Sequence, residues 1–340
     1  MTEQTIYTTS GDSPALQTAV ANAQATFKFF WRELSWESRR IVKGLSLAAV
    51  KMSFPVHSDD PEVPTVENMW LNEVDFDGVS ISGMLLNEPE WATGFDASER
   101  VTLPLAALND WMYVCGEVVF GGFTVDAMRS EMADEERAEH DAAWGLEFGA
   151  PGFVELTMMP EGQPRVRLSR ALDTPADQEA LKRLEEGDHP MAVNLSASMD
   201  EMLREHPGAV TDVDEAGWSL LHREALAGNA PMVSALLRHG ADASARTAAG
   251  QTPLQLAEQA GWPRVVRLLN GEETPVAVEV KAAAQVRSEQ EVEASTQAGR
   301  QGHAQAQAQV QAPPQGKGLP QWVIGLGVIV VAVVVWLLMR

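Results

Sequence analysis

A stretch in the second half of this chain repeats itself, and this repeat constrains the fold more than any other feature. Positions 33 residues apart carry the same or similar side chains between residues 214 and 270. They pair as Gly217 with Gly250, Leu221 with Leu254, Gly228 with Gly261, Met232 with Val265 and Leu236 with Leu269. Such a period is typical of solenoids, in which paired helices bury their apolar faces only against neighbouring units. The sequence therefore predicts an all-α solenoid here.

Each copy carries the signals of two helices joined by a glycine. The copies read DEAGWSLLHREALAGNAPMVSALLRHGADASA from Asp214 and TAAGQTPLQLAEQAGWPRVVRLLNG from Thr247. Thr252 is placed to cap a helix and Pro253 to occupy its first turn, where the missing N–H costs nothing. The pattern resembles the ankyrin repeat, which implies a surface that binds other proteins. The resemblance also implies that His222 hydrogen bonds to a neighbouring repeat.

The predicted array covers residues 176–270. It consists of a degenerate cap at 176–213 and two recognisable repeats at 214–246 and 247–270. Three units are near the minimum for a stable solenoid, because each unit buries its apolar face only against its neighbours. We therefore expect the N-terminal domain to pack on or near the first unit.

Four side chains are candidate contacts with a protein partner. They are Trp218 at one loop tip, Arg246 and Gln251 at the next, and Trp262 between two paired helices. Aromatic and arginine side chains are the usual energetic anchors of protein interfaces. The alternative interpretation is that both tryptophans are half-buried packing residues.

Residues 12–145 predict an α+β domain, an antiparallel sheet with flanking helices, and 146–175 a connecting segment. Apolar residues spaced by three or four predict a helix that opens at Ser13 and Pro14. The dipeptide Asp77-Gly78 predicts a tight turn between two strands. Extended segments are predicted at 45–54, 69–76, 79–85 and around 111–114, and a second helix at 124–143.

Several phrases of this domain resemble a bacterial family. They are FWRELSWESRRIVKGLSLAAVK at 30–51, ENMWLNEVDFDG at 67–78 and GGFTVDAMR at 121–129. These phrases look like the YegJ-like family of uncharacterised domains. The resemblance implies a bacterial origin and supplies no reaction that can be transferred to this chain.

The residues predict neither an enzyme nor a metal or cofactor site. Cys115, the only cysteine, has no nearby basic residue to lower its pKa and is interpreted as a core thiol. None of the seven histidines pairs with a second ligand at helical metal spacing. The start of the helix after Gly121 and Gly122 could bind an anion, but the nearby carboxylate of Asp126 would repel it. The rival hypothesis is an enzyme of unknown reaction in the N-terminal domain, with the repeats selecting its substrate.

The last part of the chain predicts a membrane anchor. Residues 321–339, QWVIGLGVIVVAVVVWLLM, carry no charge and would form a helix of roughly 28 Å, close to the bilayer core of roughly 30 Å. Residues 271–320 are rich in Ala and Gln and lack aromatic residues, which predicts a disordered linker. No secretory signal is recognisable after Met1. We therefore expect a single-pass membrane protein with a C-terminal anchor and a cytoplasmic body.

The charge balance limits the class of macromolecule that this chain can bind. Lys and Arg number 25 against 48 Asp and Glu, a formal charge of -23, which would repel nucleic acid. The sequence as a whole predicts a membrane-tethered adaptor or inhibitor that binds a protein through its ankyrin repeats on the cytoplasmic face. Neutralisation of a basic toxin is one form that this role could take.

Overall fold

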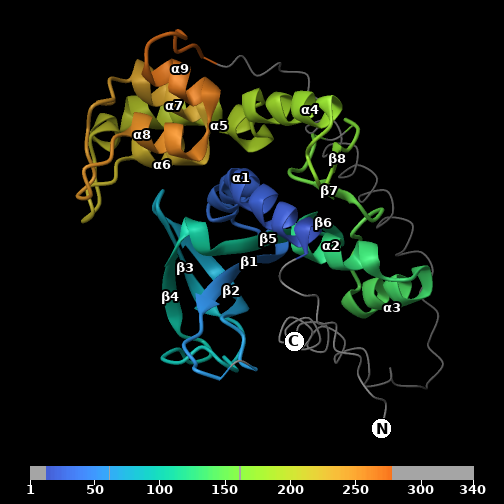
Figure 1. The fold of residues 1–340 in the computed structure, drawn as a ribbon. Helices are drawn as coiled ribbons and strands as arrows, with labels where there is room; N and C mark the ends of the chain where they lie inside the picture. Colours follow the sequence, from blue (N-terminus) through green and yellow to red (C-terminus); the bar gives the residue numbers. More distant parts are fainter. Residues whose placement is uncertain (1–12, 61, 161, 278–340) are drawn as a thin grey trace, which may run out of the picture.

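A six-stranded antiparallel sheet forms the first half of the molecule, in a computed structural model that describes residues 13–60, 62–160 and 162–277 (Figure 1). The strand order is β4-β3-β2-β1-β5-β6. The strands are β1 Leu45–Pro55, β2 Val66–Phe76, β3 Ser80–Leu85, β4 Arg100–Pro104, β5 Leu108–Cys115 and β6 Val118–Gly121, with a short 3-10 helix, η1 Leu105–Ala107, before β5. The predicted α+β class is confirmed for this part of the chain.

Helix α1, Pro14–Glu37, covers one face of the sheet. It opens after Ser13 with Pro14 in its first turn, as predicted. Ala19, Ala23, Phe27 and Phe30 are buried and spaced by three or four, so one stripe of the helix faces the strands. Trp111 Nε1 donates to the Ala23 carbonyl at 2.9 Å, which fixes the helix on β5.

The predicted hairpin turn between β2 and β3 is confirmed. Asp77 Oδ1 accepts the backbone N–H groups of Val79 and Ser80 at 2.8 and 2.7 Å. Gly78 has φ 91°, a value that favours glycine. A Cβ on Gly78 would lie 2.7 Å from the Leu256 side chain, so the hairpin tip touches the second half of the molecule.

The prediction of one continuous helix at 124–143 is wrong. The structure has two helices, α2 Phe123–Glu131 and α3 Asp134–Trp144. The chain turns extended at Met132, and the acidic residues Asp134, Glu135 and Glu136 begin a new helix, where negative charge is favoured. The segment 146–175 also contains a small unpredicted hairpin of β7 Phe153–Glu155 and β8 Arg167–Ser169.

The second half of the described chain is helical, as the repeat predicts. Its α-helices are α4 Pro175–Glu186, α5 Pro190–Glu205, α6 Leu220–Ala227, α7 Ala230–Arg238, α8 Pro253–Ala260 and α9 Pro263–Leu269, with a 3-10 turn, η2 Pro207–Val210, after α5. Gly228 and Gly261 close the first helix of each copy in the left-handed conformation. His222 Nε2 lies 3.1 Å from the Ala245 carbonyl in the loop that leads to the second copy. Ala245 belongs to the same unit, 214–246, so the expected hydrogen bond to a neighbouring repeat stays a prediction.

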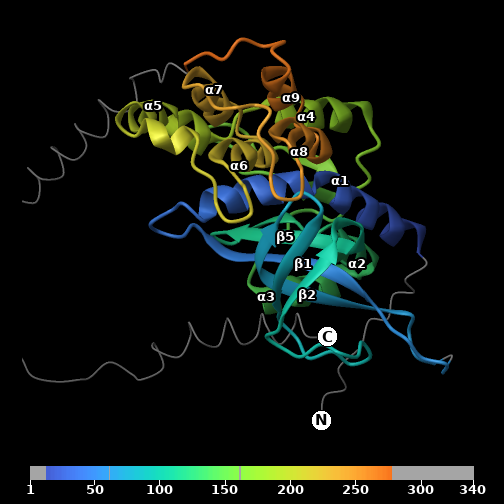
Figure 2. The same ribbon diagram turned by 90° about the vertical axis from the view of Figure 1, so that its left-hand side faces the viewer.

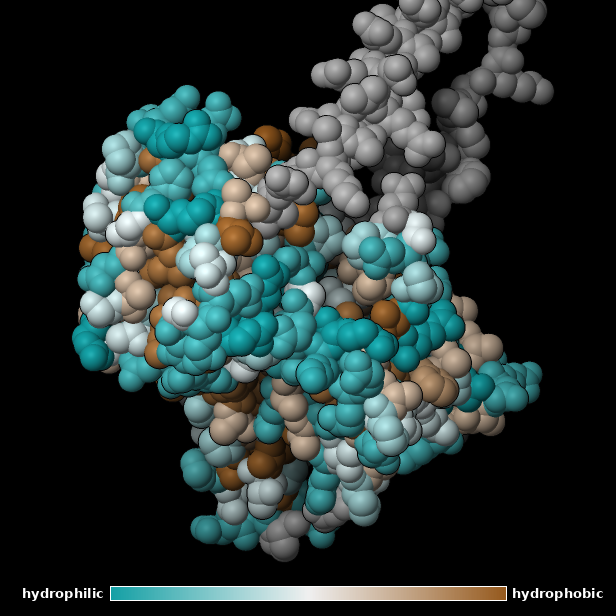
Figure 3. Space-filling view, turned by 90° about the horizontal axis from the view of Figure 1, so that it is seen from above, coloured by the Kyte–Doolittle hydropathy of each residue, from teal (hydrophilic) through white to brown (hydrophobic). Residues whose placement is uncertain are grey.

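Helix α1 lies between the sheet and the repeat helices (Figure 2). Phe29 packs edge-on against Trp262 with ring centroids 5.7 Å apart. Lys28 forms an ion pair with Glu185 at 2.6 Å. The N-terminal domain therefore packs on the repeats as expected, through α1 and the tip of the β2–β3 hairpin. The upper face is mostly hydrophilic, with apolar residues scattered among charged ones (Figure 3).

The predicted anchor at 321–339 and the linker beyond residue 277 lie outside the described residues. Within 13–60, 62–160 and 162–277, no helix combines the length and the apolar character needed to cross a bilayer.

Candidate protein-binding groove

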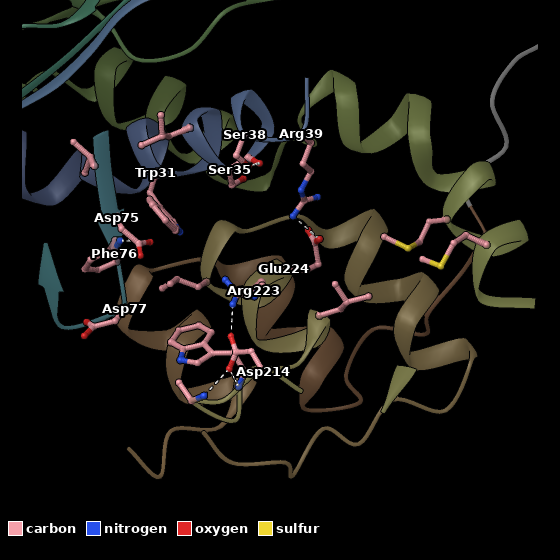
Figure 4. A pocket seen from close by; sticks show the side chains of 18 residues that line it. Trp31, Ser35, Ser38, Arg39, Asp75, Phe76, Asp77, Asp214, Arg223 and Glu224 are labelled. Atoms are coloured by element: carbon pink, nitrogen blue, oxygen red, sulfur yellow. Dashed lines mark hydrogen bonds and ion pairs between the residues drawn. The ribbon is translucent and has the colours of Figure 1, made fainter. Parts of the chain in front are cut away.

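A groove lies where α1, the β2–β3 hairpin and the first recognisable repeat meet (Figure 4). We call this space the interdomain groove. Its volume is about 670 Å³, within the range of sites that bind ligands. The lining residues come from the end of α1 and the turn after it, from 74–77 in the hairpin, from the second half of α5, and from 214–226. No local stretch of sequence builds this site alone.

The floor of the groove is apolar. Trp31 of α1 packs edge-on against Phe76 of β2, with ring centroids 5.8 Å apart. Leu220 of α6 and two methionines of α5, Met199 and Met202, line the same space. Methionine side chains adapt their shape to what packs on them. The floor is therefore suited to receive an apolar side chain without a fixed outline.

Two ion pairs form between lining residues, and each contains one of the two arginines that line the groove. Arg39 reaches Glu224 at 2.6 Å, and Arg223 pairs with Asp214. Hydrogen bonding from the Trp218 backbone N–H and the Arg223 side chain lowers the pKa of Asp214. The Glu224 side chain is only 1% exposed and also accepts from Asn229 at 2.8 Å. Both guanidinium groups therefore already have carboxylate partners.

The hairpin side of the groove carries acids without such partners. Asp75 and Asp77 are exposed, and no Lys or Arg of the described residues lies within ion-pair distance of either. The lining thus contains four carboxylates and two guanidinium groups. The hairpin side of the lining therefore carries negative charge without a cationic partner among the described residues.

One donor in the groove has no acceptor. Trp31 Nε1 is buried from solvent, and no acceptor among the described residues is close enough to bond it. Figure 4 shows the Trp31 ring extending from α1 toward α6. A buried N–H without a partner costs free energy, so this atom is a candidate contact for whatever fills the groove.

The walls are held in a fixed relation by a buried network at the end of α1. Trp36 Nε1 donates to Asn229 Oδ1 at 2.8 Å, and Asn229 in turn donates to Glu224. The Arg39 guanidinium lies 4.5 Å from the Trp36 ring centroid. Buried polar networks with satisfied partners rigidify their surroundings. The groove is therefore preformed.

Comparison with known proteins identifies both halves. Residues 216–248 match the ankyrin repeat, and residues 13–148 match a family described as an uncharacterized protein conserved in bacteria, DUF2314. A protein of Neisseria meningitidis serogroup B, named an ankyrin repeat protein, is 40% identical over 263 residues, which cover 77% of this chain and 95% of that protein. The chain belongs to this ankyrin repeat family.

Two further relatives each match one part of the chain. The uncharacterized protein YegJ of Escherichia coli K12 is 28% identical over 91 residues, 26% of this chain and 60% of YegJ. The human protein phosphatase 1 regulatory subunit 27 is 29% identical over 105 residues, 31% of this chain and 64% of that protein. The resemblances to ankyrin repeats and to YegJ are confirmed.

The ankyrin repeat positions proposed as partner contacts have different surroundings. Trp218 is half-buried and lines the interdomain groove, with the Arg223 guanidinium 5.8 Å from its ring centroid. Trp262 is only 2% exposed, which favours the alternative interpretation as a packing residue over a partner contact. It packs against Phe29, and its Nε1 donates to the Leu226 carbonyl at 3.1 Å. The tryptophan between the helices is a packing residue because α1 covers it.

The other two candidates lie outside the groove. Arg246 is exposed at the next loop and donates to the Gly250 carbonyl at 2.7 Å. The Gln251 side chain lies beside the Gly78 turn, with Nε2 buried. The structure thus places only Trp218 in the groove. The sequence placed Trp31 in a predicted helix and Phe76 at the end of a predicted strand, but no local signal showed that they would meet the repeats.

A second polar cluster lies at the start of α2. Asp110 accepts from the backbone N–H groups of Phe123 and Thr124 at 3.0 and 2.7 Å and from Thr124 Oγ1 at 2.6 Å. Lys51 Nζ donates to the same hydroxyl at 2.9 Å. Burial raises the pKa of Asp110 and lowers that of Lys51. The protein's own carboxylate thus takes the place that an anion would have at this helix end. Cys115 is half-buried at the edge of the core rather than within it as expected, and this burial raises the pKa of its thiol.

Proposed function

We propose that this protein is an adaptor or inhibitor that binds one protein partner in the interdomain groove. The observation that carries the proposal is that the ankyrin repeats and the N-terminal domain build one preformed, mostly apolar groove together. Ankyrin repeats are consistent with protein–protein interaction. Fixed walls lower the ordering cost of binding.

The chemistry of the lining supports binding over catalysis. Its two serines, Ser35 and Ser38, donate to helix carbonyls of Arg32 and Ser35 at 2.7 and 2.8 Å. No histidine belongs to the described lining. A serine nucleophile needs an adjacent base, and none is placed here. The enzyme alternative is therefore not favoured by this groove.

We further propose that residues 321–339 hold the protein at a membrane, with the groove on the cytoplasmic side. The support is the uncharged stretch of nineteen residues and its length. A tether raises the effective concentration of the body near a membrane-associated partner without any new contact. The formal charge of -23 favours a basic partner, and a basic toxin is one such target.

Site-specific photo-cross-linking of the full chain tests the groove. The photoreactive residue p-benzoylphenylalanine replaces Trp218 in the groove, or Phe153, an exposed aromatic residue of β7 outside it. We expect one discrete protein adduct in bacterial cells at position 218 and none of that mass at position 153. Equal adducts at both positions, or no adduct at 218, would contradict the proposal.

Cell fractionation tests the tether. The full chain should stay in the membrane fraction after a carbonate wash, and a chain lacking 321–340 should become soluble. Protease added outside intact cells should leave the body uncut. A full chain recovered in the soluble fraction would refute the anchor and leave the groove proposal untouched.

A further inference from the structure

We infer that the partner enters the interdomain groove with a segment that carries a large apolar side chain beside a lysine or arginine. This inference rests on the groove being the binding site. It adds the chemistry of the partner, which three independent features of the lining define.

The first feature is the unbalanced charge on the hairpin side. Arg39 and Arg223 are already paired with Glu224 and Asp214, so neither is free to attract an acidic partner. Asp75 and Asp77 keep their charges exposed at one end of the groove. Like charges brought together across an interface are repelled and opposite charges are steered into register. A cationic side chain therefore fits this end, and an acidic one is excluded.

The hairpin also orients these two carboxylates. Asp77 uses Oδ1 to accept from Val79 and Ser80, and Asp75 uses Oδ1 to accept from its own neighbour, Phe76. Within the described part of the chain, Oδ2 of each residue has no hydrogen-bond donor. Each aspartate thus accepts backbone N–H groups of the hairpin through one carboxylate oxygen and leaves the other oxygen available to a partner. An ammonium or guanidinium group on the partner would satisfy the second oxygen.

The second feature is the apolar floor beside that acidic end. Trp31 packs on Phe76 of the hairpin, and Leu220, Met199 and Met202 add to the apolar lining. Binding energy at interfaces is concentrated where one large apolar side chain fills a pocket that excludes water. The volume of about 670 Å³ is ample for an aromatic or long aliphatic side chain and the backbone that carries it.

The third feature is the unsatisfied donor. Trp31 Nε1 is buried in the floor, and the described residues offer it no acceptor. A partner segment carries carbonyl oxygens along its backbone, and one of them accepts this N–H once the side chains that cover it in the free protein have moved aside. A binding segment thus gains a hydrogen bond where the free protein has none, which favours occupancy by polypeptide.

Phage display tests this chemistry with defined probes. The full chain in detergent is exposed to a library of random 12-residue peptides, and the enriched sequences are read. We expect Lys or Arg within three positions of Phe, Trp, Leu or Met. The best peptide is then synthesised with a fluorophore, and its affinity is measured by fluorescence polarisation together with a matched peptide in which Glu replaces each cation.

Variants of the chain assign the effect to the groove. D75N/D77N should weaken the cationic peptide by roughly tenfold, and D75K/D77K should shift the preference to the Glu-containing peptide. The control E88Q/E90Q removes the same charge at exposed positions outside the lining and should bind as the parent does. Trp31→Phe keeps an aromatic ring and removes the N–H, and should weaken binding by roughly threefold to tenfold. Thermal unfolding of each variant identifies any that fail to fold.

Three results would overturn the inference: enrichment of acidic peptides, binding that is equal in D75N/D77N and the parent, or no enrichment at all. Failure of the inference alone is recognisable, since the adduct at position 218 would still form. If that adduct is also absent, the proposed function fails with it.

Discussion

The two tryptophans of the repeats show how far identical side chains can differ in role. Trp262 is buried between the repeats and Phe29, whereas Trp218 is half-buried and lines the interdomain groove. Both stand in loops of the repeats, Trp218 before the first helix of one copy and Trp262 between the two helices of the next. What separates them is α1, which covers one and leaves the other accessible.

Replacing each tryptophan by alanine should therefore affect different properties: stability for Trp262, and chiefly partner binding for Trp218. Trp262→Ala removes a large buried side chain and should lower the free energy of unfolding by about 3–5 kcal/mol. Trp218→Ala should lower it by about 1 kcal/mol and should weaken binding of the selected peptide. Urea unfolding followed by circular dichroism and fluorescence polarisation give the two readouts. Equal stability losses in both variants would contradict this division.

A buried histidine at the junction makes stability depend on pH. Burial lowers the pKa of His189, although Glu33 at 2.9 Å opposes the shift. Burial lowers the pKa of His222 as well. An unfolded histidine titrates near about 6.5. Because the folded state then binds protons less readily than the unfolded chain, the free energy of unfolding is highest above that pH and falls as the pH drops below it.

We expect the variant His189→Asn to have a shallower loss of stability between pH 7 and pH 5.5. Asparagine still caps α5 as His189 does, but it has no proton to bind. Urea unfolding at a series of pH values measures the slope, and an unchanged slope in His189→Asn would rule the histidine out as its source.

At the scale of the elements, the β2–β3 hairpin connects the sheet to the repeats. Its turn at Gly78 touches Leu256 of α8, and its residues 74–77 line the groove. The hairpin therefore has two roles. Its tip packs against the repeats, and its residues Asp75 and Asp77 line the groove. A change at its tip should affect both.

Gly78→Ala tests this contact against a matched glycine. Gly78 and Gly94 have nearly the same φ, 91° and 89°, but a Cβ on Gly94 would meet no atom within 4 Å. Both substitutions carry the strain of a left-handed residue, about 1 kcal/mol. Gly78→Ala should cost roughly 1–3 kcal/mol more, because the new Cβ would overlap Leu256. Equal losses of unfolding free energy in urea would show that the tip does not bear on the repeats.

Local patterns in the sequence predicted most of these elements and the packing of the N-terminal domain on the repeats, but not the groove between them. The spacing of apolar residues located α1, Asp77-Gly78 located the turn, and the 33-residue period located the four helices α6 to α9. The break at Met132 and the short β7–β8 hairpin were missed because each depends on a few residues with weak local signals. The groove was missed for another reason. Trp31, Phe76 and Trp218 are far apart in sequence, and only tertiary packing brings them together.

At the scale of the whole molecule, the N-terminal domain acts as a cap of the repeat array. Two recognisable repeats and one degenerate unit are few for a solenoid, whose stability comes from the interfaces between units. Trp36 supplies such an interface, since its buried ring packs with Ala192 and Met232 of the repeat side. The sheet in turn depends on α1 for its cover. The two halves should therefore unfold together.

Hydrogen exchange in increasing urea tests this coupling in the full chain. In the parent protein, amides of β1 and of α8 should become exposed at the same urea concentration. Trp36→Ala removes a side chain that packs on the repeats, so the α8 amides should exchange at lower urea than the β1 amides. Phe54→Ala removes a buried side chain of β1 that packs on Phe95 of the N-terminal domain, and should shift both sets together. Separate transitions already in the parent would mean that the repeats fold without the cap, and the groove would then join two independent bodies rather than belong to one.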